Sequence, residues 1–203
     1  MSSSYLFEDR TELDTAVDLW ISDETSATNT YGDINTWNVS AITDFGSLFY
    51  LRESFNSDIS NWDVSNGNNF LYMFKGASAF NQDISSWDVS NASSSQPGTL
   101  AAMFQDASSF NQDISSWDVS KNKDFTFMFR GASSFNQDIS NWDVSSGTDF
   151  TGMFQDAELF NQDISSWDVS ESDYFWYMFS GASSFNQDIS SWDVDVNDNL
   201  TDM

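Results

Sequence analysis

Aspartate recurs at a nearly constant spacing along most of this chain, following an asparagine and a second polar residue, as in Asn81-Gln82-Asp83. Carboxylate and amide oxygens are ligands that calcium accepts, so the pattern is compatible with a row of Ca²⁺ sites. Two other interpretations stay open. The carboxylates accept hydrogen bonds from the backbone or from serines such as Ser85, or the row binds a basic partner. The candidate metal ligands of this NQD row are Asp58, Asp83, Asp113, Asp138, Asp163 and Asp188.

A second row of aspartates lies in a repeated Ser-Trp-Asp-Val-Ser segment. If Trp87 and Val89 point into a core, the residues alternating with them point outward. Repeat proteins use such faces as extended recognition surfaces, although a merely solvated face would show the same pattern. We expect a partner-binding surface, called here the Ser/Asp face. Its residues are Ser86, Asp88, Ser90, Ser116, Asp118, Ser120, Asp143, Ser145, Asp168 and Ser170.

Composition argues against catalysis. The chain has no histidine and no cysteine, so histidine-based acid–base catalysis, cysteine nucleophiles and zinc–thiolate sites are excluded. Its acidic residues recur identically in each unit, whereas an active site is normally a unique constellation in a pocket. We therefore expect no enzyme and no cofactor other than Ca²⁺.

The net charge of −26 limits the partners of the chain. A field of this sign repels nucleic acid and anionic membrane surfaces, and it attracts cations and basic molecules. The sequence contains no apolar run of 18 residues, so no membrane insertion is expected.

Internal repetition determines the expected architecture. The tryptophans of the repeated segment are 25 residues apart, except for one interval of 30 that contains residues 91–99 and the only proline. Within one unit, Phe70, Met73, Phe74 and Ala77 have helical spacing, and the segment around Trp87 alternates as a strand does. These patterns predict a leucine-rich-repeat-like α/β solenoid with one short strand and one short helix per turn of about 25 residues. An all-β solenoid is the alternative.

The ends of the chain differ from the middle. An amphipathic pattern from Leu13 to Ile21 predicts a capping helix, so we assign residues 1–36 to an N-terminal cap and lead-in. Residues 37–203 form the predicted array of seven repeats. We expect this array to be truncated at its C-terminus, because residues 199–203 match the start of another repeat. Three Asn-x-Ser/Thr sequons are candidate glycosylation sites: Asn38, Asn91 and Asn199.

The segment YGDINTWNVSAITDF at residues 31–45, together with the repeated FNQDISSWDVS, resembles the BspA-like repeats of mycoplasma lipoproteins and other surface proteins. The resemblance covers nearly the whole chain. It implies display on a cell surface or secretion, with any signal or anchor outside this sequence. It also implies adhesion to a protein or glycan partner, and no catalytic residues.

Overall fold

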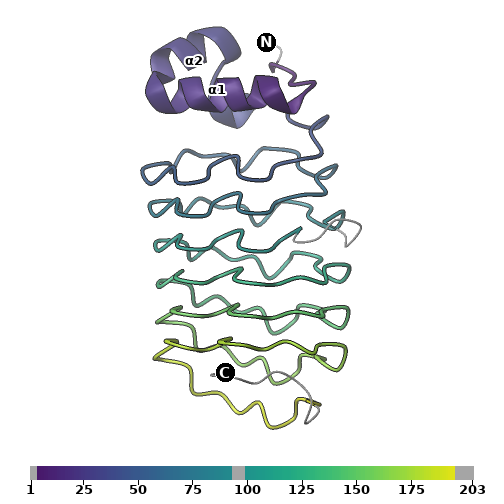
Figure 1. Ribbon diagram of the computed structural model, residues 1–203. Helices are drawn as coiled ribbons and strands as arrows, with labels where there is room; N and C mark the ends of the chain where they lie inside the picture. The colour runs from purple at the N-terminus through teal and green to yellow at the C-terminus, as the bar shows by residue number, and fades with distance from the viewer. Residues whose placement is uncertain (1–3, 93–98, 195–203) are drawn as a thin grey trace.

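The computed structural model describes residues 4–92 and 99–194. Two helices lie at one end, and beyond them the chain winds in successive turns that stack one on another (Figure 1). The helices are α1 (Arg10–Ser22) and α2 (Glu24–Tyr31), followed by the short 3₁₀ helix η1 (Ile34–Thr36). The predicted division at residue 36 and the count of seven repeats stay predictions, because the last repeat extends into residues 195–203, outside the described part.

Side-chain caps begin both α-helices. Asp9 accepts a hydrogen bond from the backbone N–H of Glu12, and Asp23 accepts one from Ser26, so each carboxylate satisfies an otherwise unpaired amide. α1 contains the predicted amphipathic segment. Its buried residues lie on one face and pack against the first turns of the stack, and they are Leu13, Ala16, Val17 and Trp20.

The predicted helix in each repeat is wrong. Residues 70–77 form consecutive β-turns, each closed by an N–H to a carbonyl three residues earlier. Tyr72 and Gly76 have positive φ angles of 60° and 72°, which end any right-handed helix. The amides of Phe70, Tyr72, Phe74 and Gly76 instead donate to carbonyls of the following turn. The spacing of apolar residues was helical because each β-turn also returns a side chain to the same face.

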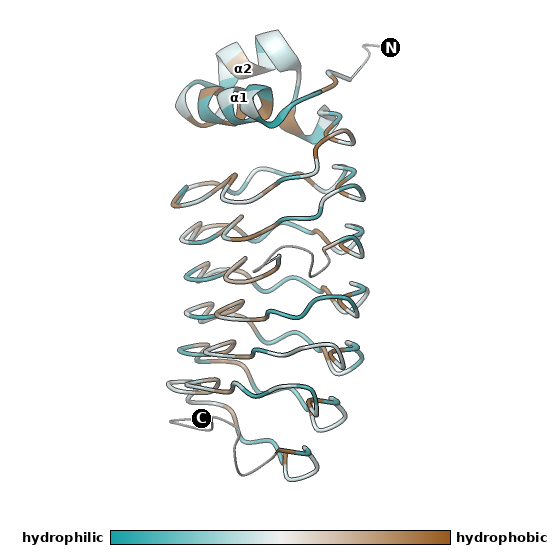
Figure 2. Cartoon of the chain, turned by 45° about the vertical axis from the view of Figure 1, so that its right-hand side comes forward, coloured by the Kyte–Doolittle hydropathy of each residue, from teal (hydrophilic) through white to brown (hydrophobic). Residues whose placement is uncertain are grey.

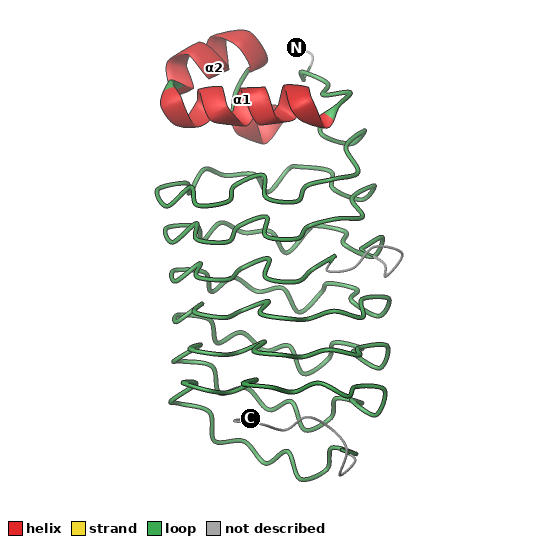
Figure 3. Ribbon diagram, in the orientation of Figure 1, coloured by secondary structure: helices red, strands yellow, loops and turns green. Residues whose placement is uncertain are grey.

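The predicted strand is also wrong, and so is the all-β alternative. Figure 3 shows the repeats as loops and turns, and no strand occurs in residues 4–92 or 99–194. Around Trp87 the chain makes two further β-turns, closed by Trp87 N–H to Ile84 at 3.1 Å and Ala92 N–H to Val89 at 2.8 Å. Too few residues separate these turns for a ladder to form. The β-type pairing between neighbouring turns in the described residues is limited to isolated parallel bridges, such as Asp124 with Asp149.

The core positions are as the sequence indicates. Hydrophobic residues recur at matching places in every turn (Figure 2), and aromatic rings stack in columns through the molecule. Phe104, for example, lies 5.7 Å from both Phe74 and Phe129, with ring planes 4° apart in each pair. In the unit from residue 70 to 90 the predicted apolar residues are all at most 3% exposed: Phe70, Met73, Phe74, Ala77, Phe80, Ile84, Trp87 and Val89.

Tryptophan indoles link neighbouring turns. The Trp142 N–H donates to the backbone oxygen of Ile114 at 3.1 Å, and this bond repeats from Trp62 to Trp192. Each indole therefore adds a second hydrogen bond to a carbonyl that already closes a β-turn, as the Ile114 carbonyl does with the N–H of Trp117. The 30-residue interval between tryptophans does not shift the alignment of neighbouring turns. The N–H of Phe70 donates to the carbonyl of Thr99 just as the N–H of Phe45 donates to the carbonyl of Asn69. Residues 93–98 of the predicted insertion lie outside the described part.

The inter-turn peptide groups of residues 70–77 and their counterparts are aligned. The carbonyl of Asn69 accepts from the preceding turn, while the N–H of Phe70 in the same peptide group donates to the following turn. Aligned peptide dipoles add up, leaving a negative end where the carbonyls begin. In the first repeat these carbonyls belong to Asp44 and Gly46, and the Arg10 guanidinium donates to them at 3.0 and 2.9 Å. Arg10 of α1 therefore covers the carbonyl end of the stack.

Candidate functional site

Each aspartate of the Ser/Asp face forms a turn with the serine two residues later. The backbone N–H of Ser90 donates to the Asp88 carboxylate at 3.0 Å, and the same bond recurs in four other repeats at 3.1–3.2 Å. This local turn fixes the carboxylate without burying it, since Asp88 and its counterparts remain exposed. The structure therefore brings these aspartates into one column on the surface, with one aspartate per turn.

The serines that precede tryptophan have a structural role. The Ser86 hydroxyl donates to the carbonyl of Ser60 at 3.0 Å, and Ser116 donates to Ser85 at 2.8 Å. Both hydroxyls bridge neighbouring turns while their residues stay exposed. Of the predicted Ser/Asp face, the carboxylates are therefore the groups with most capacity left for a partner.

The NQD row makes the same kind of turn. Asp83 accepts from the N–H of Ser85 at 2.9 Å, and the corresponding bond occurs in the other five members. The adjacent asparagines form a column of their own: Asn81 Oδ1 accepts from the Asn111 N–H and from the Gln112 side chain, both at 2.9 Å. The asparagine oxygens of the NQD motif are thus engaged in the stack, at Asn56, Asn81, Asn111, Asn136 and Asn161. Among the described residues, no group of three or more acidic side chains is placed to hold a metal ion.

Hydrogen bonds from serine lower the pKa of aspartates in both rows. The Ser90 side chain and then its backbone N–H hold the pKa of Asp88 below the ordinary value of 3.8, and Ser85 acts in the same way on Asp83. A neighbouring carboxylate opposes the effect, since Asp83 raises the pKa of Asp113, but hydrogen bonding dominates. These side chains therefore stay ionised at neutral pH. The other aspartates of the two rows with a lowered pKa are Asp113, Asp118, Asp138, Asp163, Asp168 and Asp188.

These shifts predict destabilisation in acid. A carboxylate with a lower pKa in the folded state binds fewer protons there than in the unfolded chain. Its stabilising contribution is present above pH 3.8 and is lost as the pH falls through the lower folded value. We expect the free energy of unfolding to fall with pH below 3.8, and NMR titration should show Asp88 and Asp168 titrating below this value. Carboxyl resonances that titrate at or above 3.8 would contradict the assignment.

Sequence reasoning missed a set of exposed aromatic residues beside the repeated core positions. Tyr72 is 37% exposed and carries the Lys75 ammonium over its ring at 4.8 Å, and Arg130 lies 5.3 Å from the ring centre of Phe127. The signal that could have found them is variation between units, because these positions differ among the repeats while the aspartates do not. The exposed aromatic residues are Tyr50, Tyr72, Tyr174, Trp176 and Tyr177.

Two of the three sequons lie in described segments. Asn38 accepts a hydrogen bond from the hydroxyl of Ser40 at 2.7 Å, and Asn91 donates to the Ser65 carbonyl at 2.6 Å. Both side chains therefore hold local turns. Asn199 lies outside the described residues.

The fold and the two aspartate rows define the class: a repeat protein whose turns stack on aromatic columns and expose one aspartate of each row per turn. A family model described as "Mycoplasma protein of unknown function, DUF285" matches residues 21–130 and 98–203. These matches cover most of the chain, so the protein belongs to this family. No curated protein and no solved structure matches the chain.

The family is compatible with a protein displayed at a surface. Within the described segments, neither α-helix has the length and apolar character needed to cross a membrane.

Proposed function

We propose that the protein is a non-enzymatic recognition scaffold, secreted or displayed on a cell surface, that binds a basic region of a macromolecular partner along its Ser/Asp face. The observation that supports this function is the column of exposed aspartates, each held in the same orientation by its own serine turn. The repeats resemble BspA-like surface proteins, which supports adhesion as the biological role. Among the protein and glycan partners that this resemblance implies, a protein with clustered lysine or arginine fits best.

The electrostatics of the column suit such a partner. Regularly spaced negative charges on a stack attract a cationic chain from a distance and fix its register on contact. Because these carboxylates are exposed, their attraction is screened by salt over about 8 Å at physiological ionic strength. Binding should therefore weaken steeply as salt is raised.

Neutralising the column tests the proposal. In a variant with Asp88→Asn, Asp118→Asn, Asp143→Asn and Asp168→Asn, each amide oxygen can still accept the serine N–H, so the turns should be kept. We expect affinity for a fluorescent octalysine peptide, measured by anisotropy, to fall at least about tenfold, or about 1.4 kcal/mol. The midpoint of thermal unfolding should stay close to that of the parent, because the loss of the carboxylate–serine hydrogen bonds is opposed by the relief of repulsion between neighbouring aspartates, as between Asp88 and Asp118.

A control variant with the same change in net charge distinguishes the effect of the aspartate column from the effect of the total charge of the protein. The variant Glu8→Gln, Glu24→Gln, Glu53→Gln and Glu158→Gln removes four exposed carboxylates that lie outside both rows. It should lose much less affinity than the aspartate variant. Equal losses in the two variants would show that net charge alone attracts the peptide, and the proposed face would be rejected.

Calcium binding by the NQD row is the alternative proposal. Ca²⁺ bound only by the folded protein would raise its stability by mass action. Thermal unfolding in EDTA, in millimolar Ca²⁺ and in Mg²⁺ or NaCl of matched ionic strength distinguishes the cases. A rise specific to Ca²⁺ would favour this alternative. Since the neighbouring amides are already engaged, we expect the same response to every salt, as screening of the −26 charge predicts.

A further inference from the structure

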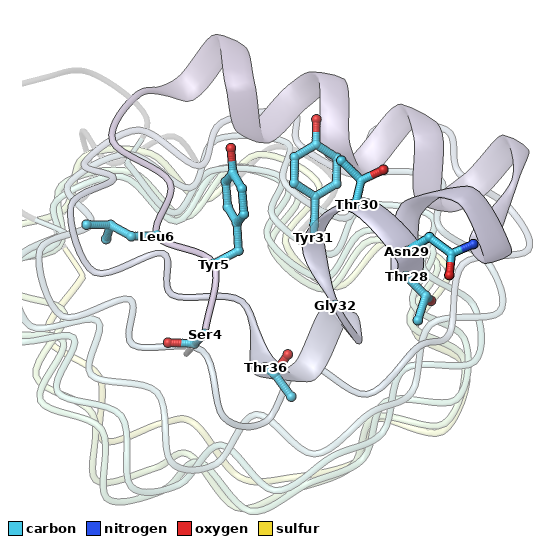
Figure 4. A pocket seen from close by; sticks show the side chains of 9 residues that line it. All are labelled: Ser4, Tyr5, Leu6, Thr28, Asn29, Thr30, Tyr31, Gly32 and Thr36. Carbon is cyan, nitrogen blue, oxygen red and sulfur yellow. The ribbon is translucent and has the colours of Figure 1, made fainter. Parts of the chain in front are cut away.

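A pocket lies between the N-terminal segment and the end of α2 (Figure 4). It encloses about 520 Å³ and lies against residues 4–6, the last turn of α2 and η1. This volume falls in the range of small-molecule sites, about 300–1,000 Å³. The pocket shares no residue with the Ser/Asp face, so a ligand bound in it is independent of the proposed function.

Two tyrosines form its aromatic wall. The rings of Tyr5 and Tyr31 meet edge to face with their centres 4.9 Å apart, and both pack on the buried ring of Phe7. The Tyr5 hydroxyl donates to the Glu12 carboxylate, which raises the pKa of Tyr5 to about 12 and keeps this phenol neutral. The wall is therefore uncharged and held in place by the core.

The remaining lining is polar but uncharged. Thr28 and Asn29 contribute a hydroxyl and an amide group, and no lining residue is acidic or basic. The Thr36 hydroxyl donates to the carbonyl of Asp33 at 2.7 Å and can accept from a ligand. Gly32 ends α2 with a φ of 84°, and its N–H donates to the carbonyl of Thr28. The helix carbonyls that follow Thr28 lie at the negative end of α2, which favours hydroxyl donors and disfavours anions. No carboxylate lines the pocket to pair with a cation.

We propose that this pocket binds a neutral saccharide unit. A sugar ring has an apolar face of C–H groups that can pack on the tyrosine wall, and hydroxyls that both donate and accept. The threonine and asparagine side chains and the helix carbonyls supply matching donors and acceptors. A phosphate would face the negative end of α2 and the net charge of the chain, and an ammonium ion would find two rings in mutual contact where an aromatic cage needs them apart.

The test uses the whole chain and four methyl glycosides: those of glucose, galactose, mannose and N-acetylglucosamine. Binding is followed by saturation-transfer NMR and calorimetry, with tetramethylammonium and inorganic phosphate as comparison probes. Thr28→Trp fills the pocket from an exposed helical position. Thr25→Trp makes the same change on the same helix at an exposed residue outside the lining. We expect at least one glycoside to bind, with affinity reduced at least about tenfold by Thr28→Trp and unchanged by Thr25→Trp.

Three outcomes would overturn the proposal: no glycoside binds at millimolar concentration, the comparison ions bind in preference to the glycosides, or Thr28→Trp leaves glycoside binding unchanged. The variants are used only after thermal unfolding shows that both keep the parent stability. Loss of octalysine binding in the aspartate variant has no bearing on these results, so the two proposals can fail separately.

Discussion

Replacing Phe104 by alanine is expected to lower the free energy of unfolding by about 4 kcal/mol, as is typical for a large aromatic residue removed from a core. The Phe104 ring is fully buried in the middle of the stack. It lies 3.9 Å from the ring of Phe110 and 5.7 Å from the equivalent rings of both neighbouring turns. Alanine therefore leaves a cavity bounded by three turns. Urea unfolding followed by tryptophan fluorescence measures the loss.

The matched control is Phe179→Ala, the same substitution at the same place in the last described turn. Phe179 is only partly buried, although it too contacts a ring of its own turn, Phe185, at 4.0 Å. Because stability in stacked repeats is set by nearest neighbours, the terminal substitution should cost clearly less. Equal losses at the two positions would contradict a continuous core that passes through the stack.

The second large effect is expected from Trp142→Phe, at about 2 kcal/mol. Phenylalanine fills most of the indole volume but cannot donate a hydrogen bond. The backbone oxygen of Ile114, which accepts from Trp142 at 3.1 Å within the core, would then keep only its turn-closing bond from the Trp117 N–H. Losing one net hydrogen bond costs about 1 kcal/mol, and the smaller ring adds a cavity cost of about 1 kcal/mol. The same urea measurement applies.

Trp20→Phe is the control for this prediction. Trp20 is also buried and also donates a hydrogen bond, at 2.9 Å, but its acceptor is the partly exposed hydroxyl of Ser57. Water can replace the lost donor there, so the penalty should be smaller by about 1 kcal/mol. If the two substitutions cost the same, indole bonds between turns would not be a main source of stability.

Burial could be predicted from the sequence, whereas backbone conformation could not. The repeat identifies Phe70, Phe74 and Trp87 as core, and all three are buried. Their spacing cannot distinguish a helix from successive β-turns, since both return side chains to one face. The deciding feature is a positive φ, which Tyr72 and Phe127 adopt although non-glycine residues seldom do so. Inter-turn hydrogen bonds stabilise that conformation, and they arise from stacking, which no single repeat displays.

Of the candidate sites, the aspartate–serine turns could be predicted from the sequence and the pocket could not. Local geometry is encoded in short motifs, and the expectation that a serine such as Ser85 donates to its neighbouring aspartate is confirmed by a bond of 2.9 Å. The pocket beside Tyr5 and Tyr31 has no such signal, because it forms between segments about 25 residues apart that match no repeat unit. The partner-binding role of the Ser/Asp face stays a prediction.

The most direct test of that role is NMR mapping of the contact surface. The backbone amides of Ser90, Ser120 and Ser170 donate to the carboxylates that we propose a basic partner contacts, so their shifts report on those carboxylates. On titration with octalysine, the largest shift changes should fall on these serines and disappear in the four-aspartate variant. Changes centred on Tyr72 and Tyr177, or spread evenly over all acidic residues, would contradict recognition through the Ser/Asp face.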